Sequence, residues 1–406
     1  MKVKVWKILS LILIVVFAMS IAHSVYGLTV IATIPVGTPG TDNPYDYGAA
    51  YDSGKGEVFV SNAGSDTVSV ISDKTNSVVA TVPMRYAPYA VAYDSAKGEI
   101  FVANGNAATT LGTVSVISDS TNTVVANITV GSDPGGIAYD PSKGELFVSN
   151  QDDIPPDISV ISDSTNTVVA TIPTGGTTGD WPQGEAYDSA TGMIYVAIQG
   201  YDAVDVISDS TNAVVTTIPT EYPPQAGVAY GVAYDPGKSE IFVTHAGENT
   251  VTVISDTTNT IIANITVGLT PEDLAYDSST GQIFVANTVD GTVSVISDST
   301  NTVTSTITVG GGAFDVAYDS GQNEIFVTNA GDSTVSVISN SSSTSATASP
   351  TSSSSASSTV TSSSTPKVPE FSCTALISAA AAITVVTLSA VAVGRKKTKK
   401  IDCGVL

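Results

Sequence analysis

Between residues 28 and 340 the chain has no cysteine, one histidine (His245) and one arginine (Arg85). Without cysteine this segment has no disulfide framework and no thiol nucleophile. Zinc and copper sites usually need several His or Cys ligands, and one histidine also excludes lyases that rely on paired histidines. A Ser-His-Asp triad would have to use His245, and no nucleophile-elbow phrase accompanies it. We therefore predict no catalytic residues, no bound cofactor and no enzymatic activity.

Basic residues are scarce in the same segment. The chain has 38 acidic residues, and because only Glu370 and Asp402 fall outside 28–340, 36 of them lie within it. A body this negative repels phosphate backbones, which excludes nucleic acid as a partner, and it attracts cations or basic surfaces. The alternative is that the charge serves solubility in salty surroundings, with Asp used in turns. The segment's basic residues are Lys55, Lys74, Arg85, Lys97, Lys143 and Lys238.

The N-terminal residues 1–27 have the pattern of a secretory signal peptide. Lys2, Lys4 and Lys7 form the positive region, an apolar run follows over 8–19, and small residues such as Ala22 and Ser24 offer a cleavage site. The alternative is an uncleaved N-terminal anchor. Both interpretations predict export of the chain.

The C-terminal residues predict a membrane tether. Residues 341–368 are rich in Ser and Thr and cannot bury enough apolar surface to fold, so we expect a disordered stalk that could carry O-linked glycans. An apolar run over 371–394 is long enough to cross a bilayer of about 30 Å. Its basic end, 395–400, and the tail 401–406 would stay cytoplasmic, which places residues 28–340 at the extracellular face of the cell membrane.

The order of motifs within residues 369–400 has a known parallel. The tripeptide Pro369-Glu370-Phe371, an apolar helix and a basic cluster together resemble the archaeal PEF-type C-terminal sorting signal. The resemblance implies that a membrane sortase cuts near the motif and passes the protein to a lipid. Here Ser372 stands where a Pro often follows. The alternative is a plain stop-transfer helix that is retained as the anchor.

Seven copies of one repeat fill the segment between these ends. The tripeptide Ala-Tyr-Asp recurs with tyrosines at positions 51, 93, 139, 187, 234, 276 and 318, at steps of 42, 46, 48, 47, 42 and 42 residues. Each copy continues through three more short phrases that are rich in Val, Ile, Thr and aromatic residues and bounded by Gly, Asp, Asn or Ser. Four strands per copy at this period predict an all-β fold, a seven-bladed β-propeller over residues 28–340.

One phrase carries a family resemblance. It appears as Phe59-Val-Ser-Asn62, Phe101-Val-Ala-Asn104, Phe147-Val-Ser-Asn150, Phe284-Val-Ala-Asn287 and Phe326-Val-Thr-Asn329. With the Val-Ser-Val-Ile and Val-Val-Ala-Thr-Ile-Pro phrases that follow, the segment resembles the YVTN family of seven-bladed propellers, which includes archaeal surface-layer proteins. Two copies depart from the phrase, because Ile198 and His245 stand where Asn is expected; we interpret His245 as filling that turn position.

The seventh copy lacks its fourth strand, since the chain enters the Ser/Thr-rich stalk after Asn340. A matching phrase lies at the other end, where residues 30–37 copy the fourth strand of the other repeats. An open ring would leave unpaired strand edges that invite aggregation. We therefore predict that residues 29–36 pair with the last blade and close the ring.

Length varies on one face of the predicted ring. If the strands of a blade are named a to d, the a–b and c–d turns share one face and keep a constant length, whereas every insertion falls in a b–c or d–a connection. Binding residues concentrate on variable loops held by a rigid scaffold. The alternative is neutral drift with packed aromatics. The predicted binding rim comprises Tyr45, Tyr47, Asp152, Asp153, Asp157, Asp180, Trp181, Glu221, Tyr222 and Tyr230.

Aspartate recurs in the Ala-Tyr-Asp and Ile-Ser-Asp phrases, where we expect it to accept hydrogen bonds from backbone N–H groups in turns. The loops at 151–153 and 289–291 could hold Ca²⁺, although no EF-type spacing occurs. Three sequons mark candidate glycosylation sites at Asn127, Asn264 and Asn340.

Together these patterns predict a cell-surface binding or adhesion protein, associated with a surface layer, whose loop rim contacts a protein or glycan. The alternative is an extracytoplasmic, Ca²⁺-dependent, lactonase-like hydrolase that uses acidic residues in the central funnel, because a fold alone does not fix a function. A third possibility is a purely structural spacer.

Overall fold

The computed structural model describes residues 27–37, 48–105, 111–153, 155–174, 181–220 and 228–340. The predicted signal peptide up to residue 26, the stalk, the PEF-like motif, the apolar run and the tail lie outside these residues. In the described ranges, no helix combines the length and apolar character needed to cross a membrane.

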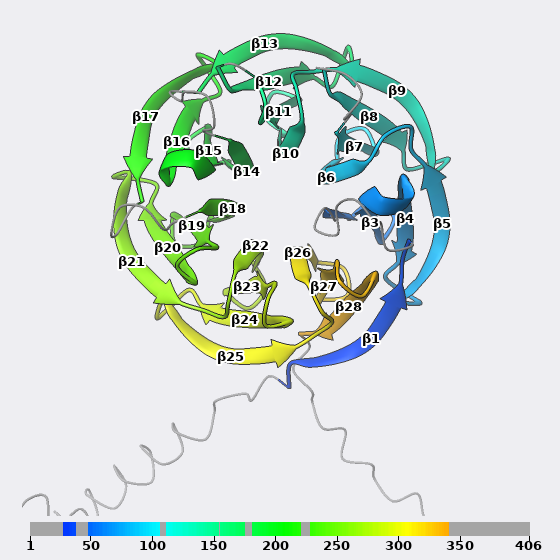
Figure 1. Ribbon diagram of the computed structural model, residues 1–406, viewed down its shortest axis with the longest axis vertical. Coiled ribbons are helices and arrows are strands. Elements are labelled where there is room, and N and C mark those ends of the chain that lie inside the picture. Colours follow the sequence, from blue (N-terminus) through cyan, green and yellow to red (C-terminus); the bar gives the residue numbers. More distant parts are fainter. Residues whose placement is uncertain are drawn as a thin grey trace, which may run out of the picture. The chain divides into compact units, whose positions relative to one another are not determined.

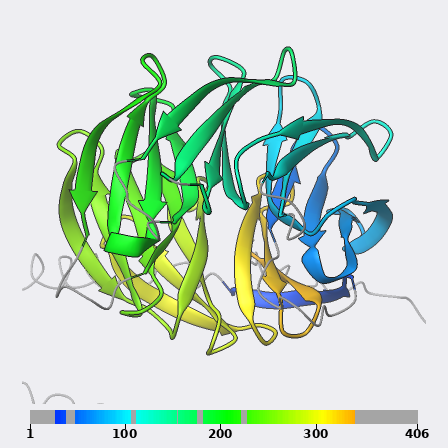
Figure 2. The same ribbon diagram turned by 45° about the horizontal axis from the view of Figure 1, so that its top comes forward.

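Seven four-stranded antiparallel sheets stand around a central axis, which confirms the predicted seven-bladed propeller (Figure 1). In each blade, strand a lies nearest the axis and strand d lies at the circumference. The inner strands run along the axis, and the twist of each sheet turns the outer strands across it (Figure 1 and Figure 2). The a strands of blades 1 to 7 are β2 (Ala49–Asp52), β6 (Pro88–Asp94), β10 (Pro134–Asp140), β14 (Pro182–Asp188), β18 (Ala229–Asp235), β22 (Pro271–Asp277) and β26 (Ala313–Asp319).

The remaining strands follow the same order in every blade. The b strands are β3 (Glu57–Asn62), β7 (Glu99–Asn104), β11 (Glu145–Asn150), β15 (Met193–Ile198), β19 (Glu240–His245), β23 (Gln282–Asn287) and β27 (Glu324–Asn329). The c strands are β4 (Thr67–Ser72), β8 (Thr113–Ser118), β12 (Asp157–Ser162), β16 (Ala203–Ser208), β20 (Thr250–Ser255), β24 (Thr292–Ser297) and β28 (Thr334–Ser339). The d strands are β5 (Ser77–Pro83), β9 (Thr123–Thr129), β13 (Thr167–Pro173), β17 (Ala213–Pro219), β21 (Thr260–Thr266), β25 (Thr302–Thr308) and, for blade 7, β1 (Thr29–Pro35). Short 3₁₀ turns, η1 (Ala63–Ser65) and η2 (Gln199–Tyr201), lie in the b–c connections of blades 1 and 4.

The hydrophobic core lies between neighbouring blades. Strands b and c are apolar on both faces because each blade is packed between two others; five of the six residues of β3 are buried. The outer strand β9 alternates exposed residues with half-buried or buried ones, as a sheet edge beside solvent does. Seven apolar clusters, one at each junction between blades, hold the ring together. Each blade is therefore stabilised mainly by its neighbours.

The Asp of the Ala-Tyr-Asp phrase closes the a–b turn, as predicted. Its carboxylate in blade 1, Asp52 Oδ1, accepts hydrogen bonds from the N–H groups of Gly54 at 2.8 Å and Lys55 at 3.1 Å. The turn ends at Gly56, whose φ of 71° suits glycine. A side chain there would also collide with Asp73 of the Ile-Ser-Asp phrase, because an added Cβ would lie 2.4 Å from Asp73 Oδ2.

The Tyr of the same phrase links neighbouring blades. The Tyr93 hydroxyl of blade 2 faces the Asp52 carboxylate of blade 1, and burial followed by this carboxylate raises the pKa of Tyr93 to about 12. The same relationship recurs around the ring and so explains why Tyr and Asp recur together. The other pairs are Tyr139 with Asp94, Tyr187 with Asp140, Tyr234 with Asp188, Tyr276 with Asp235, Tyr318 with Asp277 and Tyr51 with Asp319.

The N-terminal strand closes the ring, as predicted. Strand β1 pairs antiparallel with β28, with Thr29 opposite Ser339 and Ile34 opposite Val335, and a bulge between Val30 and Ala32 (Figure 1). The side chain of Ile34 is buried in the cluster between blades 7 and 1. The last blade is thus built from both ends of the described chain.

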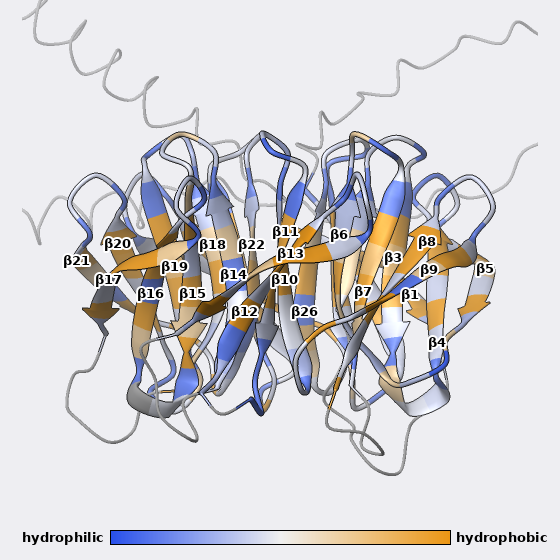
Figure 3. Cartoon of the chain, turned by 90° about the horizontal axis from the view of Figure 1, so that it is seen from above, coloured by the Kyte–Doolittle hydropathy of each residue, from blue (hydrophilic) through white to orange (hydrophobic). Residues whose placement is uncertain are grey.

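The two faces of the ring differ in their connections. The a–b and c–d turns lie at one end of the blades, and the b–c and d–a connections lie at the other (Figure 3). On the face of the short turns, lysines reach an Asp in the next blade, with Nζ–Oδ1 distances of 3.8 Å for Lys55–Asp119, 3.5 Å for Lys97–Asp163 and 3.4 Å for Lys143–Asp209. Such partly exposed pairs contribute little, about 0–1 kcal/mol each.

Candidate binding site in the central channel

The structure separates the predicted rim residues into groups. Tyr45, Tyr47, Asp180, Glu221 and Tyr222 lie outside the described residues. Asp152 and Asp153 belong to the b–c connection of blade 3 and Asp157 begins the c strand β12, where burial, and then the charge of Asp153, raise the pKa of Asp157. Trp181 precedes β14 and is 42% exposed, while Tyr230 lies in the central channel. Whether these residues bind a partner stays a prediction.

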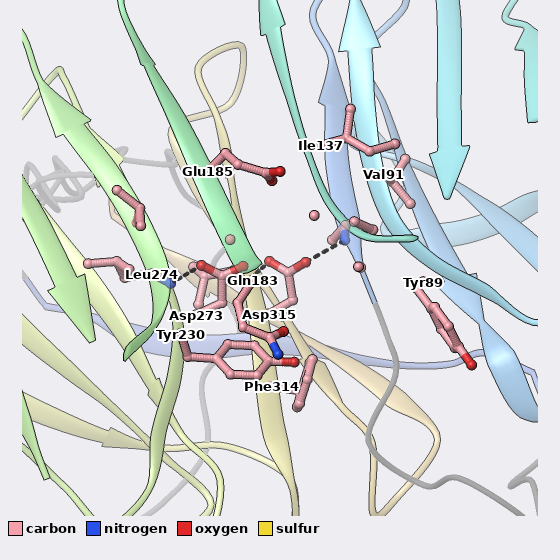
Figure 4. A pocket seen from close by; sticks show the side chains of 18 of the residues that line it. Tyr89, Val91, Ile137, Gln183, Glu185, Tyr230, Asp273, Leu274, Phe314 and Asp315 are labelled. Atoms are coloured by element: carbon pink, nitrogen blue, oxygen red, sulfur yellow. Dashed lines mark hydrogen bonds between the residues drawn. The ribbon is translucent and has the colours of Figure 1, made fainter. Parts of the chain in front are cut away.

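A cavity of about 340 Å³ occupies the centre of the ring (Figure 4). It is lined mainly by residues from the first half of each a strand. Because strand a begins where the d–a connection enters, the cavity lies toward the face that carries the variable connections. Asp133 and Gln151 come from connections on that face and also line the cavity.

A bulge in strand a decides which residues face the channel. In β10 the pairing with β11 passes from Pro134–Asn150 to Ile137–Val148, so two residues are left out of register. The corresponding irregularity is present in β6, β14, β18, β22 and β26. At the bulge, strands of neighbouring blades come close: a Cβ added to Gly231 would lie 2.6 Å from both Glu272 O and Asp273 Oδ1.

Three acidic residues interrupt this regular pattern. At the second bulge position five blades have Gly or Ala, whereas blades 6 and 7 have Asp273 and Asp315. At the next position six blades have an aliphatic residue or Ala, whereas blade 4 has Glu185. The small residues of the first set are Gly48, Ala90, Gly136, Gly184 and Gly231, and the residues of the second are Ala49, Val91, Ile137, Val232, Leu274 and Val316. The acids are therefore not required by the fold of the repeat.

Asp273 and Asp315 lie side by side and are hydrogen-bonded to each other. The backbone N–H of Ala49 in blade 1 donates to Asp315 Oδ2 at 2.8 Å, and the N–H of Leu274 donates to Asp273 Oδ1 at 2.7 Å (Figure 4). Burial, and then the neighbouring carboxylate of Asp273, raise the pKa of Asp315 well above its usual range. Burial raises the pKa of Asp273 to about 6. The pair therefore keeps a shared proton to a higher pH than a single solvent-exposed carboxyl group does.

Glu185 lines the same cavity from β14. Its Oε1 accepts a hydrogen bond from the Ser149 hydroxyl of blade 3, while Oε2 is buried without a hydrogen-bond partner. The glycine at position 136 makes room for this oxygen, because an added Cβ would lie 2.0 Å from Glu185 Oε2. Burial raises the pKa of Glu185 to about 8, with a further contribution from the charge of Asp273.

Aromatic and amide side chains complete the wall. The Tyr230 and Phe314 rings meet edge to face, with centroids 5.8 Å apart and an angle of 82° between the ring planes. Gln183 donates to Gln199 at 2.8 Å and accepts from Gln151 at 3.0 Å, which fixes its amide. No Lys, Arg or His lines the described part of the cavity. The channel therefore offers carboxyl groups, amides and ring edges, but no cation.

Across the described ranges, no group of three or more His, Cys, Asp and Glu side chains is placed to hold a metal. The loops at 151–153 and 289–291 contain Asp152, Asp153 and Asp290, and Asp290 accepts a hydrogen bond from the N–H of Leu269 at 2.8 Å. Calcium binding stays an untested possibility.

His245 stands at the end of its b strand, in the position that Asn occupies in five other blades. Its side chain is 1% exposed, and Nδ1 lies 2.8 Å from Asp202 Oδ1 in the preceding blade. The other ring nitrogen, Nε2, is buried without a hydrogen-bond partner. The equivalent Asn of blade 7, Asn329, donates within its own blade to Thr334 Oγ1 at 3.0 Å, and its Oδ1 accepts from the N–H of Gly310, which follows the d strand of blade 6, at 3.0 Å.

The three sequons differ in accessibility. Asn127 and Asn264 lie on the outer strands β9 and β21 and are exposed. Asn340 is 1% exposed, and its Nδ2 donates to Asp277 and, at 3.2 Å, to Thr280 Oγ1 in blade 6. Modification of Asn340 would require these Nδ2 contacts to break, whereas Asn127 and Asn264 accept hydrogen bonds through Oδ1, from the hydroxyls of Ser115 and Thr252 at 2.8 Å.

Comparison with known proteins identifies the fold alone. No protein-family profile matches the chain, and no curated protein sequence matches it. Among solved structures, the chain is similar to a chain of Kuenenia stuttgartiensis hydrazine synthase, with a TM-score of 0.65 and 18% sequence identity. The similarity covers 74% of this chain and 97% of the other. At this identity the similarity extends to the seven-bladed propeller and not to an activity.

The three channel acids were not predicted from the sequence. Recurring Asp residues were predicted to lie in turns, and Asp273, Asp315 and Glu185 do not recur. Their signal is nevertheless present in the sequence, since an alignment of the seven copies shows an acid where the others have Gly, Ala or an aliphatic residue. The lysines of the a–b turns, whose partners lie in the next blade, were not predicted either.

Proposed function

We propose that this protein is a cell-surface binding propeller of the YVTN type that presents one loop-bearing face to a protein or glycan partner. One observation carries the proposal: the central cavity lies toward the face on which all length variation falls. A regular ring needs neither feature. Variable connections and a concave centre on one rigid face are typical of binding scaffolds.

The positions of the chain ends support the same orientation. Strand β28 ends, and strand β1 begins, on the face of the short turns, opposite the variable connections. A tether that continues from residue 340 would therefore leave from the opposite face and keep the loop-bearing face free. The predicted signal peptide, stalk and apolar run supply the rest of this proposal, as does an archaeal surface-layer context.

The anchor can be tested separately. Retention of the helix predicts a mature protein that ends at Leu406, whereas the PEF-type signal predicts cleavage near Pro369 and an added lipid. Mass spectrometry of the mature C-terminus distinguishes these two outcomes. An intact Leu406 would rule out sortase processing and leave the binding proposal unchanged.

The binding face can be tested by capture. The immobilised propeller, residues 28–340, is exposed to surface-protein extract and to a glycan array. Variants replace 38–47, 175–180 or 221–227 with Gly-Ser segments of equal length, and a control replaces exposed Ser and Thr residues of the c–d turns. We expect capture of a partner to be lost in the loop variants only. Loss in the control alone, or no dependence on either face, contradicts the proposal.

A hydrolase is the second candidate, because three carboxyl groups line the channel. A lactonase-like enzyme would need Ca²⁺ held by such groups. Metal analysis of the purified protein followed by a lactone-hydrolysis assay tests it. Stoichiometric Ca²⁺ together with turnover that is lost in Asp315→Asn would favour the enzyme over the binding protein.

A further inference from the structure

The channel acids form a local exception in an otherwise repetitive molecule. Five blades have Gly or Ala at the position of Asp273 and Asp315, and these blades form the same four-stranded sheets. Burying a carboxyl group without a counter-ion costs free energy, because its ionised form loses hydration. No contact of the fold requires these carboxyl groups, since the other blades form without them. We therefore expect Asp273 and Asp315 to interact with a molecule other than this chain.

The cavity is lined by acidic side chains and by no basic one among the described residues, which favours a positively charged ligand. Carboxyl groups approach it from blades 4, 6 and 7, and Asp133 lines it from the connection that precedes blade 3. None of the described ion pairs reaches Glu185, Asp273 or Asp315. Glu185 Oε2 is buried and accepts no hydrogen bond, so a donor is missing at that point. A positively charged donor satisfies both requirements.

The placement of the acids favours an organic cation over a metal ion. The two aspartates are held to each other and to the backbone N–H groups of blades 1 and 6, and the described acids do not gather as a metal-binding group. An ammonium or guanidinium group carries several N–H donors and can bridge carboxylates that are spread apart. The aromatic side chains of Tyr230 and Phe314 line the same cavity, and aromatic rings attract such cations.

We propose that the channel binds a protonated amine or guanidinium group, held between Asp273 and Asp315 on one side and Glu185 on the other. A Lys or Arg side chain inserted by a protein partner through the loop-bearing face is the source that best fits the acidic body of the propeller. This source rests on the proposed binding function, whereas the cation site itself does not. The cavity of about 340 Å³ has the size of a small ligand pocket.

Binding exchanges a cation for a proton. When the ammonium or guanidinium group enters, the protons held by the Asp273–Asp315 pair and by Glu185 leave to solvent, and the carboxylates become ionised. The other titratable residues that line the cavity with this pair are Glu185, Asp133, Tyr89 and Tyr230. Affinity should therefore fall as pH decreases, and binding near neutral pH should release protons.

The test uses the full-length protein, purified as the cell makes it, and isothermal titration calorimetry. The probes are n-butylammonium and n-butylguanidinium as side-chain mimics, butanol as a neutral control, CaCl₂, and a lysine-bearing peptide. The variants are Asp273→Asn, Asp315→Asn and Glu185→Gln. Asp66→Asn serves as the matched control, because it removes the same charge from an exposed residue in the b–c connection of blade 1. Circular dichroism checks that each variant is folded.

We expect both cations to bind, and Asp273→Asn or Asp315→Asn to weaken them by about tenfold or more, as for a lost charge-assisted hydrogen bond. Asp66→Asn should bind as the parent does. Tighter binding of the peptide than of the small amines supports the side-chain source, and equal binding supports a free amine. Equal binding of butanol, no effect of the Asn variants, or Ca²⁺ that displaces the amines would overturn the proposal.

The two proposals fail separately. If amines bind in the channel but no partner depends on the loops, the cation site stands and the binding face is wrong. If loop-dependent capture succeeds but no cation binds, the binding face stands and the channel proposal is wrong.

Discussion

Tyr51 of the first blade faces Asp319 of the last, and this contact repeats at the closing junction what Tyr93 and Asp52 do between blades 1 and 2. The junction between blades 7 and 1 therefore has the same Tyr–Asp contact as the other junctions, although blade 7 is assembled from both ends of the described chain. Burial followed by the Asp319 carboxylate raises the pKa of Tyr51, so its hydroxyl keeps its proton throughout the physiological range.

Removing that hydroxyl should weaken the closing junction. We expect Tyr51→Phe to lower the free energy of unfolding by about 1 kcal/mol, the typical value of one buried polar contact. Urea titration measures the change, with Tyr86→Phe as control, because the Tyr86 ring keeps its contact with Arg85 without the hydroxyl. Equal stability of Tyr51→Phe and the parent would show that the contact adds nothing.

The closing strand offers a sharper comparison between two isoleucines. Ile34 is 4% exposed and Ile31 is 49% exposed, although both lie on β1. We expect Ile34→Ala to cost about 2–5 kcal/mol through the cavity it leaves. Ile31→Ala should change stability by no more than about 0.5 kcal/mol.

Deleting residues 28–37 should destabilise the whole domain, because β28 would lose the strand that pairs with it. An unchanged melting temperature would refute the role of β1 in closure.

Glu185 should make the protein less stable as pH rises. Its pKa is about 8 in the folded protein and about 4.3 when unfolded, so the folded state holds a proton that the unfolded state has lost between these values. Stability then falls from about pH 4.3 to about pH 8, by up to about 1.4 kcal/mol for each pKa unit before screening by channel water.

Glu185→Gln should remove that slope. We expect the variant to match the parent near pH 4 and to exceed its stability near pH 8 by about 1 kcal/mol or more. Thermal melting across this range, with Asp66→Asn as the charge-matched control, measures it. Parallel curves for the parent and the Gln variant would mean that Glu185 is ionised at no cost.

The His245–Asp202 contact should appear as coupling between two blades. In a double-mutant cycle of His245→Asn and Asp202→Asn, we expect an interaction free energy of about 0.5–3 kcal/mol. His245→Asn alone should destabilise the protein, because it leaves Asp202 with only Thr220, whose hydroxyl lies 3.2 Å from Asp202 Oδ1. A cycle that pairs His245→Asn with Asp290→Asn should be additive. Additivity in both cycles would refute a specific contact.

The fold could be predicted well from the sequence because the same strand and turn patterns occur in all seven repeats. The Ala-Tyr-Asp spacing gave the number of blades, and the copy of strand d near the N-terminus, residues 30–37, gave the closure between β1 and β28. The Asp52 turn was predicted from the tendency of Asp to bind turn N–H groups, and the structure places two such bonds there.

The site was harder to predict because it depends on single copies. Asp273, Asp315 and Glu185 face the channel only because a bulge shifts the register of strand a, and an unbulged strand would direct alternate residues differently. Tyr230 was predicted for the rim, yet the same bulge places it in the channel against Phe314. The cross-blade lysines likewise depend on how neighbouring sheets twist, which no local pattern records.

Closure by β1 makes synthesis order matter for folding. The segment that is made first must wait for β28, which is made last among the blades, before either can pair. Contacts between such distant segments form late, because the chain entropy of bringing them together opposes them. A truncated chain that lacks β28 would expose two unpaired strand edges at once. Such an incomplete chain would be prone to proteolysis or aggregation, and only a full set of blades would close the ring.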